Sequence, residues 1–192
     1  MLDIVLLASE IPANTGNIGR TCAVTGARLH LIRPLGFSLD DGMVKRAGLD
    51  YWEDLDVHVH DSFERFLEDE PQAADGLFLF TKKTTRLYTE VSYPAKSYLV
   101  FGRESSGIPE SILVAHPEAC VRIPMLPDCE AIDDDAFSHT RVYAQKNRQR
   151  SAAGEVVSLN LSDAVAIGAY EALRQQGFPG LQREGHLNRL EW

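Results

Sequence analysis

Three separate stretches of this 192-residue sequence could do chemistry, and the first runs from Pro12 to Arg20. Gly16 permits a tight turn and Asn17 can cap a helix, which would hold Arg20 one turn inside that helix. This position is the carboxyl edge of a strand, where open α/β sheets bind their ligands. A guanidinium there suits phosphate, because it offers a planar fork of donors. A surface arginine on an amphipathic helix is the simpler interpretation of this stretch alone.

The second stretch runs from Leu99 to Pro109 and contains two glycines and an acid. A strand is expected to end on Gly102, where the missing Cβ would let a ligand lie against the backbone. Glu104 could accept amide hydrogens or hold a sugar hydroxyl. A solvated turn explains the same residues equally well.

The third stretch is divided between two places in the chain. Ile123 and Met125 stand at the end of an expected strand that Pro124 stops, because proline cannot donate to a sheet ladder. Ser158, Leu159 and Asn160 stand at the start of a helix. Backbone groups here would be free to bind an adenine edge, with both polar side chains facing the same crevice. Helix capping also accounts for the two polar residues, and capping and binding can hold together.

The sequence lacks the motifs of several common binding sites. Neither GxGxxG nor GxxxxGK[ST] occurs, so dinucleotide and P-loop sites are not indicated. Cys22, Cys120 and Cys129 form no CxxC pair and are odd in number, which favours reduced thiols in a cytoplasm. His58 and His60 could share a strand face, but packed or solvated imidazoles are a simpler interpretation than a metal site. No apolar run approaches the ~20 residues of a membrane span, and the N-terminus does not resemble a signal peptide.

Strands alternate with helices along the chain, which predicts an α/β fold with a mainly parallel sheet flanked by helices. We expect a single domain over residues 1–192. Strands are expected over Leu2–Leu7, Arg28–Arg33, Trp52–His60, Gly76–Thr81, Ser97–Gly102 and Val121–Met125. Helices are expected from about Asn17 to Gly26 and over Asp40–Ala47, Ser62–Asp69, Pro109–Ala115 and Leu161–Leu173.

The last of these helices is apolar almost all round, so it should be buried on most sides. Asn160 can cap its first amides, and Asp163 lies in its first turn, where the helix dipole favours an acid. Between Ala164 and Ala172 the side chains are mostly small. Another segment of the chain or another subunit should therefore pass close to this helix.

A segment of about thirty residues, 126–157, interrupts the third stretch as an insertion. Its later part places Arg141, Lys146, Arg148 and Arg150 around an aromatic, Tyr143, as RNA-binding segments do. A solvated surface loop explains the insertion equally well. The net charge is −9, and segment 40–75 accounts for all of it, so an acidic face and a separate RNA-binding face are compatible.

The three stretches extend into longer motifs. The first reads IPANTGNIGRTCAVTGARLHLI over Ile11–Ile32, followed by PLGF at Pro34–Phe37 and KRAGLDYW at Lys45–Trp52. The second reads YLVFGRESSGIPESIL over Tyr98–Leu113, and the third joins RIPM at Arg122–Met125 to SLNLSDAVAIGAYEALRQQGFPG at Ser158–Gly180. Together they resemble the SPOUT superfamily of RNA methyltransferases. The closest likeness within it is to the small single-domain enzymes that methylate the ribose 2′-oxygen of the tRNA wobble nucleotide.

This resemblance implies a C-terminal trefoil knot, in which the last helix is threaded through a loop. The small residues of that helix would allow the loop to pass close to it. It also implies a homodimer with active sites at the subunit interface, S-adenosylmethionine as cofactor, S-adenosylhomocysteine as product, and no metal. By matching position, cofactor contacts fall at Phe80, Gly102, Ile123, Met125, Ser158 and Leu159. Arg20 is the catalytic candidate, supported by Asn14, Glu104 and Asn160.

The chemistry that the resemblance implies needs little machinery. The sulfonium is already a strong methyl donor, so the protein must align a ribose hydroxyl with the methyl and help remove a proton. Because an arginine in a protein is effectively always protonated, we expect Arg20 to grip a phosphate and stabilise the developing oxyanion. Arg103 stands where relatives often have Asn or Pro and could contact RNA. Two alternatives stay open: the same reaction on another tRNA or rRNA nucleotide, and a non-catalytic knotted RNA-binding module.

Overall fold

The structure, a computed structural model, describes residues 1–39, 52–125, 158–187 and 189. The helix expected over Asp40–Ala47 lies outside the described residues. So does the insertion 126–157, with Arg141, Lys146, Arg148 and Arg150.

Six parallel strands form one sheet in the order β3-β2-β1-β5-β4-β6. The α/β fold expected from the sequence is confirmed. Their bounds are β1 Leu2–Leu7, β2 Arg28–Ile32, β3 Val57–His60, β4 Leu77–Phe80, β5 Ser97–Phe101 and β6 Cys120–Val121. Because β1 lies between β2 and β5, the strand order changes direction there, and a crevice is expected beyond the carboxyl ends of these strands.

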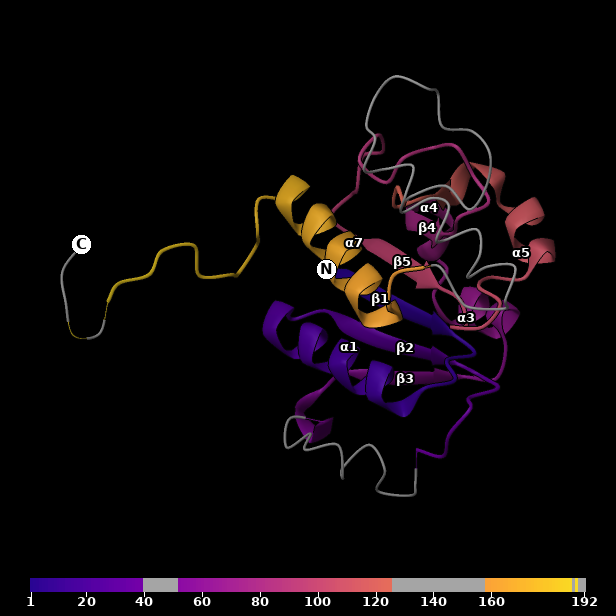
Figure 1. Ribbon diagram of the computed structural model, residues 1–192, viewed down its shortest axis with the longest axis horizontal. Coiled ribbons are helices and arrows are strands. Elements are labelled where there is room, and N and C mark those ends of the chain that lie inside the picture. The colour runs from indigo at the N-terminus through magenta and orange to yellow at the C-terminus, as the bar shows by residue number, and fades with distance from the viewer. Residues whose placement is uncertain (40–51, 126–157, 188, 190–192) are drawn as a thin grey trace, which may run out of the picture.

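Helices cover both faces of the sheet. On one face lie α1 (Pro12–Thr25) and α7 (Leu161–Gln175), which Figure 1 shows in front of the strands. On the other lie α3 (Phe63–Asp69), α4 (Ala73–Gly76) and α5 (Glu110–Ala115). Two short 3₁₀ turns, η1 (Trp52–Asp54) and η2 (Pro117–Ala119), complete the described elements.

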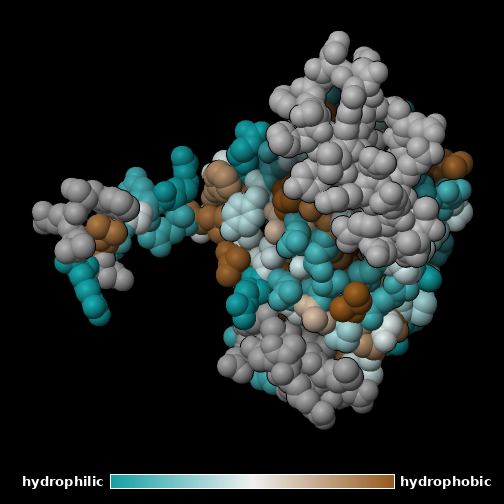
Figure 2. Space-filling view, in the orientation of Figure 1, coloured by the Kyte–Doolittle hydropathy of each residue, from teal (hydrophilic) through white to brown (hydrophobic). Residues whose placement is uncertain are grey.

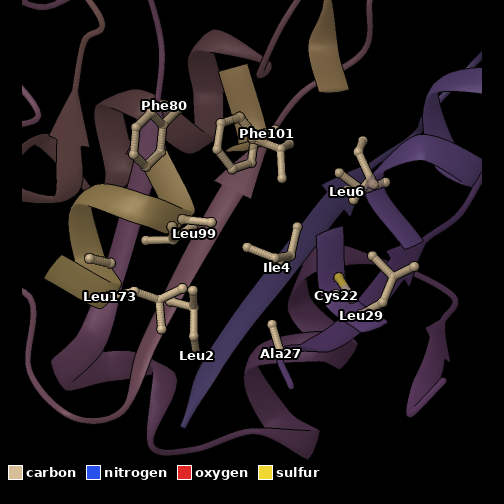
Figure 3. Packing of buried hydrophobic residues seen from close by; sticks show 14 of the residues in the cluster. Leu2, Ile4, Leu6, Cys22, Ala27, Leu29, Phe80, Leu99, Phe101 and Leu173 are labelled. Atoms are coloured by element: carbon tan, nitrogen blue, oxygen red, sulfur yellow. The ribbon is translucent and has the colours of Figure 1, made fainter. Parts of the chain in front are cut away.

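The alternation of side chains in the strands divides the core into two layers. Leu2, Ile4 and Leu6 of β1 pack toward α1 and α7, and Figure 3 shows Leu2 beside Leu99 and Leu173. Val5 and Leu7 point the other way, into the layer beneath α3 and α5. Strands covered on both faces are apolar almost throughout, as the continuous run Leu2–Leu7 predicted.

Helix α1 begins earlier than the sequence suggested. It begins at Pro12 instead of Asn17, because proline has a backbone φ suited to the first helical position and needs no partner for a missing N–H. Asn17 therefore does not cap the helix, and Gly16 is buried inside it. Arg20 lies in the third turn, not one turn from the start.

Three strand predictions were too long or displaced. The strand expected from Trp52 begins only at Val57, after η1, and Gly76 ends α4 instead of opening β4. The strand expected over Val121–Met125 is the short β6, which ends at Val121. Arg122 pairs with the preceding loop instead, because its N–H donates to the Arg86 carbonyl oxygen at 2.9 Å.

Helix α7 is capped as predicted, but it is less enclosed than predicted. The Asn160 side chain accepts a hydrogen bond from Ser162 N at 2.8 Å. Val165, Gly168, Ala169 and Ala172 are buried, whereas Tyr170 is 48% exposed. The small residues let the helix lie close to the sheet: a Cβ on Gly168 would come within 2.8 Å of the Phe80 ring.

Within the ranges that the structure describes, we find no helix long and apolar enough to cross a bilayer. The same ranges contain no group of three or more His, Cys, Asp or Glu side chains arranged to hold a metal ion.

Candidate functional site

A cavity of about 770 Å³ opens at the carboxyl ends of β1, β4 and β5. The loops after these strands, the segment after β6 and the start of α7 surround it. This is the place where an open parallel sheet is expected to bind a ligand. The structure brings to this cavity the predicted residues Asn14, Phe80, Gly102, Arg103, Glu104, Ile123, Met125, Ser158, Leu159 and Asn160.

Two stacked aromatic rings form the apolar wall of the cavity. Phe80 and Phe101 are partners in the pairing of β4 and β5, and their ring centroids lie 4.6 Å apart. Figure 3 shows both rings at the carboxyl ends of their strands, near α7. Both side chains are buried, so this wall is fixed by the core.

The loop after β5 is a tight turn that depends on its two glycines. A Cβ on Gly102 would lie 2.1 Å from the backbone carbon of Gly107, far inside any real contact distance. Gly107 has a φ of +71°, in the left-handed region that favours glycine. Its N–H donates to the Arg103 carbonyl oxygen at 2.8 Å and closes the turn. The turn lines the cavity along its whole length.

Glu104 joins this turn to the loop after β1. Its carboxylate accepts hydrogen bonds from the backbone N–H groups of Glu10 (2.9 Å) and Ile11 (3.2 Å). It also accepts one from Asn14 Nδ2 at 3.0 Å and a longer one from Ser9 Oγ at 3.4 Å. The negative charge therefore lies at the start of α1, where the helix dipole favours it. With four donors around it, this carboxylate is suited to positioning the loop.

Asn14 extends the connection to α7. Its side-chain oxygen accepts a hydrogen bond from Asn160 Nδ2 at 3.0 Å, while its nitrogen donates to Glu104. The Asn160 oxygen in turn accepts from the Ser162 backbone N–H. These partners fix the orientation of both amides, since turning either one would set donor against donor. One chain of hydrogen bonds thus joins the three motif segments.

Arg20 lies apart from this constellation. It is exposed on α1 and is not among the described residues that line the cavity. It follows Asn14 by six residues, so it points to a different side of the helix. The structure therefore does not bring the predicted catalytic arginine to the cavity of its own chain.

Four residues that the sequence did not single out also line the cavity: Glu10, Thr81, Lys82 and Lys83. Lys83 forms an exposed ion pair with Glu110 at 2.8 Å. All four follow the carboxyl ends of β1 or β4. That position was the available signal, because loops after parallel strands share one edge of the sheet.

Comparison with known proteins identifies the family. Residues 1–132 match the SpoU rRNA Methylase family. The chain belongs to the SpoU methylase family. The membership expected from the three motifs is thereby confirmed.

Two relatives of this SpoU methylase are similar over almost their whole length. The tRNA (cytidine(34)-2'-O)-methyltransferase of Escherichia coli strain K12 is 46% identical over 182 residues, which cover 94% of this chain and 97% of that protein. The protein of the same name from Yersinia pestis is 44% identical over 184 residues, covering 94% and 97%. A solved structure concerned with the 2-OH methylation of C/U34 on tRNA has a TM-score of 0.71 and is 40% identical, covering 92% of this chain and 97% of that one.

Proposed function

We propose that this protein transfers a methyl group from S-adenosylmethionine to the ribose 2′-oxygen of a tRNA nucleotide, the wobble nucleotide 34. The observation that carries the proposal is that one cavity is lined by all six cofactor residues that the resemblance implies. Relatives named for this reaction match nearly the whole chain.

The residues around the cavity fit S-adenosylmethionine. Its volume lies in the range of small-molecule pockets, and its wall offers apolar contact beside exposed backbone. Ile123, Met125 and Leu159 would hold the adenine, and Gly102 would let the ligand approach the backbone. When bound, the cofactor supplies an activated methyl group on a sulfonium. The chain itself must supply alignment of the ribose and a polar environment for the oxygen that loses its proton.

The rim of the cavity is suited to the phosphates of an RNA. Lys82, Lys83 and Arg103 bring three cations to it. The two acids at the rim, Glu10 and Glu104, are both occupied by hydrogen-bond donors. A tRNA backbone could therefore approach despite the net charge of −9, because local charge steers a ligand more than the total does.

We further propose a homodimer in which Arg20 serves the cavity of the second copy. Arg20 lies outside the cavity of its own chain, yet its motif predicts a role in catalysis. The face formed by α1 and α7 exposes large apolar side chains, including Val24 at 61% and Tyr170 at 48%. Figure 2 shows hydrophobic side chains among polar ones on this face. Covering them with a second copy would bury apolar area and bring α1 of each copy to the other.

Mixing two inactive variants tests the shared site. Arg20→Ala and Asn14→Ala should each be nearly inactive alone. After the subunits are exchanged, mixed dimers hold one cavity with an intact Asn14 and an intact Arg20 from the other copy. About a quarter of wild-type activity should return, because half the dimers are mixed and half their sites are complete. No recovery, with exchange verified by differently tagged copies, would contradict a shared site.

We also propose that the chain forms a C-terminal trefoil knot and that the protein acts in the cytoplasm. A knot would place α7 behind the cavity wall, and the close approach of Gly168 to Phe80 supports such tight packing. Cys22 and Cys120 are free thiols, as in a reducing cytoplasm that also contains the tRNA.

Methyl transfer to isolated RNAs tests the function. Purified protein is incubated with labelled S-adenosylmethionine and either tRNA from a strain lacking the gene or ribosomal RNA without its methyl groups. Label in tRNA, recovered as a 2′-O-methyl nucleoside, is the expected result. Label in ribosomal RNA alone would replace the proposed substrate, and label in neither would favour a non-catalytic RNA-binding module.

A further inference from the structure

A reciprocal pair of carboxylates connects the loop after β1 to the turn after β5. Glu104, in the turn, accepts the backbone N–H groups of Glu10 and Ile11. Glu10, in the loop, accepts in the opposite direction, from the Ser105 backbone N–H at 3.0 Å and the Ser105 hydroxyl at 2.9 Å. Ninety-five positions separate Glu10 from Ser105 in sequence, so each bond ties together remote segments.

The loop after β1 is itself held firmly, so it can act as an anchor. The Ser9 carbonyl oxygen accepts from Gly36 N at 2.9 Å, and Ser9 Oγ lies 3.0 Å from Thr15 Oγ1. Residue 36 must be glycine, because a Cβ there would lie 2.7 Å from the Glu10 backbone. The turn after β5 carries Ser105 and Ser106 exposed to solvent. The Glu10 carboxylate therefore connects Ser105, at the tip of this turn, to a fixed part of the fold.

We propose that Glu10 is a positioning residue for the methyl-donor cavity. Its carboxylate holds Ser105 so that the turn Gly102–Gly107 has its binding shape before the cofactor enters. A turn that is already ordered loses less conformational freedom on binding, which strengthens affinity without adding a contact. This inference rests on the proposed function, because it takes the ligand of the cavity to be S-adenosylmethionine.

Calorimetry with S-adenosylhomocysteine tests the inference without any need for turnover. Glu10→Ala removes both bonds to Ser105. It should weaken binding roughly tenfold, because part of the binding free energy must then order the released turn. Glu10→Gln should recover most of the affinity, to within about threefold, because its oxygen can accept the N–H while its nitrogen donates to the hydroxyl. Glu68→Ala, which removes an exposed glutamate on α3, is the matched control and should bind like the wild type.

Ser105→Ala supplies the other half of a double-mutant cycle. It should weaken binding less than Glu10→Ala does, because the backbone N–H of residue 105 remains. Combined with Glu10→Ala, it should add little further loss, since both changes break the same contact. With tRNA present, Glu10→Ala should raise KM for S-adenosylmethionine while kcat at saturation stays within about twofold, because Arg20 and Asn14 are unchanged.

The inference is overturned if Glu10→Ala binds S-adenosylhomocysteine as the wild type does. A lower melting temperature accompanied by that unchanged dissociation constant would make Glu10 merely structural. If the wild type itself gives no binding heat, the proposed function fails, and this inference fails with it. Wild-type binding with an indifferent Glu10→Ala leaves the proposed function standing.

Discussion

Strand β1 has carboxylates near both of its ends, and they are used differently. Beyond its carboxyl end, Glu104 and Glu10 accept mainly backbone N–H groups of loops around a cavity. Near its amino end, Asp3 is fully buried and pairs with charged or titratable side chains. Its Oδ1 lies 2.5 Å from Arg28 Nε and 3.0 Å from His30 Nε2, and its Oδ2 lies 2.8 Å from Lys96 Nζ.

The network of titratable side chains continues across the sheet. His30 Nδ1 lies 3.0 Å from His60 Nε2, and His60 Nδ1 lies 3.0 Å from Asp69 Oδ2. Nearby, the Tyr98 hydroxyl donates to Glu70 at 2.6 Å. None of these residues lines the cavity, so this network of side chains belongs to the body of the fold.

The difference shows that the role of a carboxylate depends on whether its partners are backbone groups of loops or side chains in the interior. A carboxylate that holds loop backbone at the sheet's carboxyl edge shapes a ligand site. One that is surrounded by side chains in the interior chiefly sets stability and its pH dependence, because leaving any partner unpaired there is costly. Variants at the two ends of β1 should therefore separate stability from ligand binding.

The largest effect is expected at the interior end. Asp3→Ala leaves Arg28, Lys96 and His30 without their shared partner and should lower the free energy of unfolding by about 3–5 kcal/mol. Urea unfolding measures this change. Binding of S-adenosylhomocysteine by the folded fraction should be unaltered, and Asp3→Asn, which keeps an acceptor, should lose clearly less stability. A lost ligand affinity at unchanged stability would reverse the comparison.

Gly102→Ala, unlike Asp3→Ala, should weaken ligand binding by the folded protein. Because the new Cβ would lie 2.1 Å from Gly107, the turn must open, and the cavity with it. We expect at least about tenfold weaker binding of S-adenosylhomocysteine, with a stability loss of about 1–3 kcal/mol from the strain. Gly185→Ala is the matched control, since a Cβ there meets nothing within 4 Å. Equal affinities for the two variants would refute a fixed turn.

Acid should destabilise the fold through the interior network. Burial lowers the pKa of His30 below its ordinary 6.5. Burial alone would raise the pKa of Asp3, but the bonds from His30, Lys96 and Arg28 outweigh it and leave that pKa below 3.8. For Glu70 the bonds from Tyr98 and Arg28 likewise outweigh burial and hold the pKa below 4.5.

All three shifts mean that the unfolded chain binds more protons as the pH falls, so stability must fall with it. The loss should begin as the pH drops below about 6.5, where the unfolded His30 is protonated and the folded one is not. A second loss should follow below about 4.5 from the carboxylates. Urea unfolding between pH 4 and 8 measures the first stage, and His30→Gln should remove it. Stability that rises from pH 6.5 to 5 would contradict the assigned directions.

The smallest effect is expected at the rim. Replacing Lys82 and Lys83 together by Ala should weaken tRNA binding only a few-fold. It should also reduce the slope of log affinity against log salt by about one to two, since up to two phosphate contacts are lost. The free energy of unfolding should change by less than about 1 kcal/mol, because the Lys83–Glu110 ion pair is exposed. Arg65→Ala, an exposed cation on α3, serves as the control and should leave the salt slope intact.

The features that depend on a few neighbouring residues could be predicted from the sequence. The apolar run of β1, the glycine at the end of β5 and the Asn160 cap of α7 are each visible in a few neighbouring residues. The start of α1 was misplaced because Gly16 and Asn17 were interpreted as a turn and a cap, while Pro12 already suits a first helical turn.

Contacts between remote segments could not be predicted in this way. Glu10 gives no local sign that Ser105 is its partner, and Lys82 and Lys83 resemble any polar loop until β4 is placed beside β5. The interior network is hidden for the same reason. His60 was interpreted as a packed or solvated imidazole, and its partners His30 and Asp69 come from β2 and α3. Asn14, Phe80 and Arg103 were found only through the resemblance to known methyltransferases, whereas the other predicted residues of the cavity were also suggested by local pattern.

The most direct test of the proposed reaction removes a single oxygen atom from the substrate. Two tRNAs are prepared that differ only in having ribose or 2′-deoxyribose at nucleotide 34, and each is incubated with the protein and labelled S-adenosylmethionine. The account predicts one methyl group in the first tRNA, mapped to nucleotide 34, and none in the second. Equal labelling of both tRNAs would mean that the methyl group is transferred to an atom other than the 2′-oxygen of nucleotide 34. That result would contradict the account.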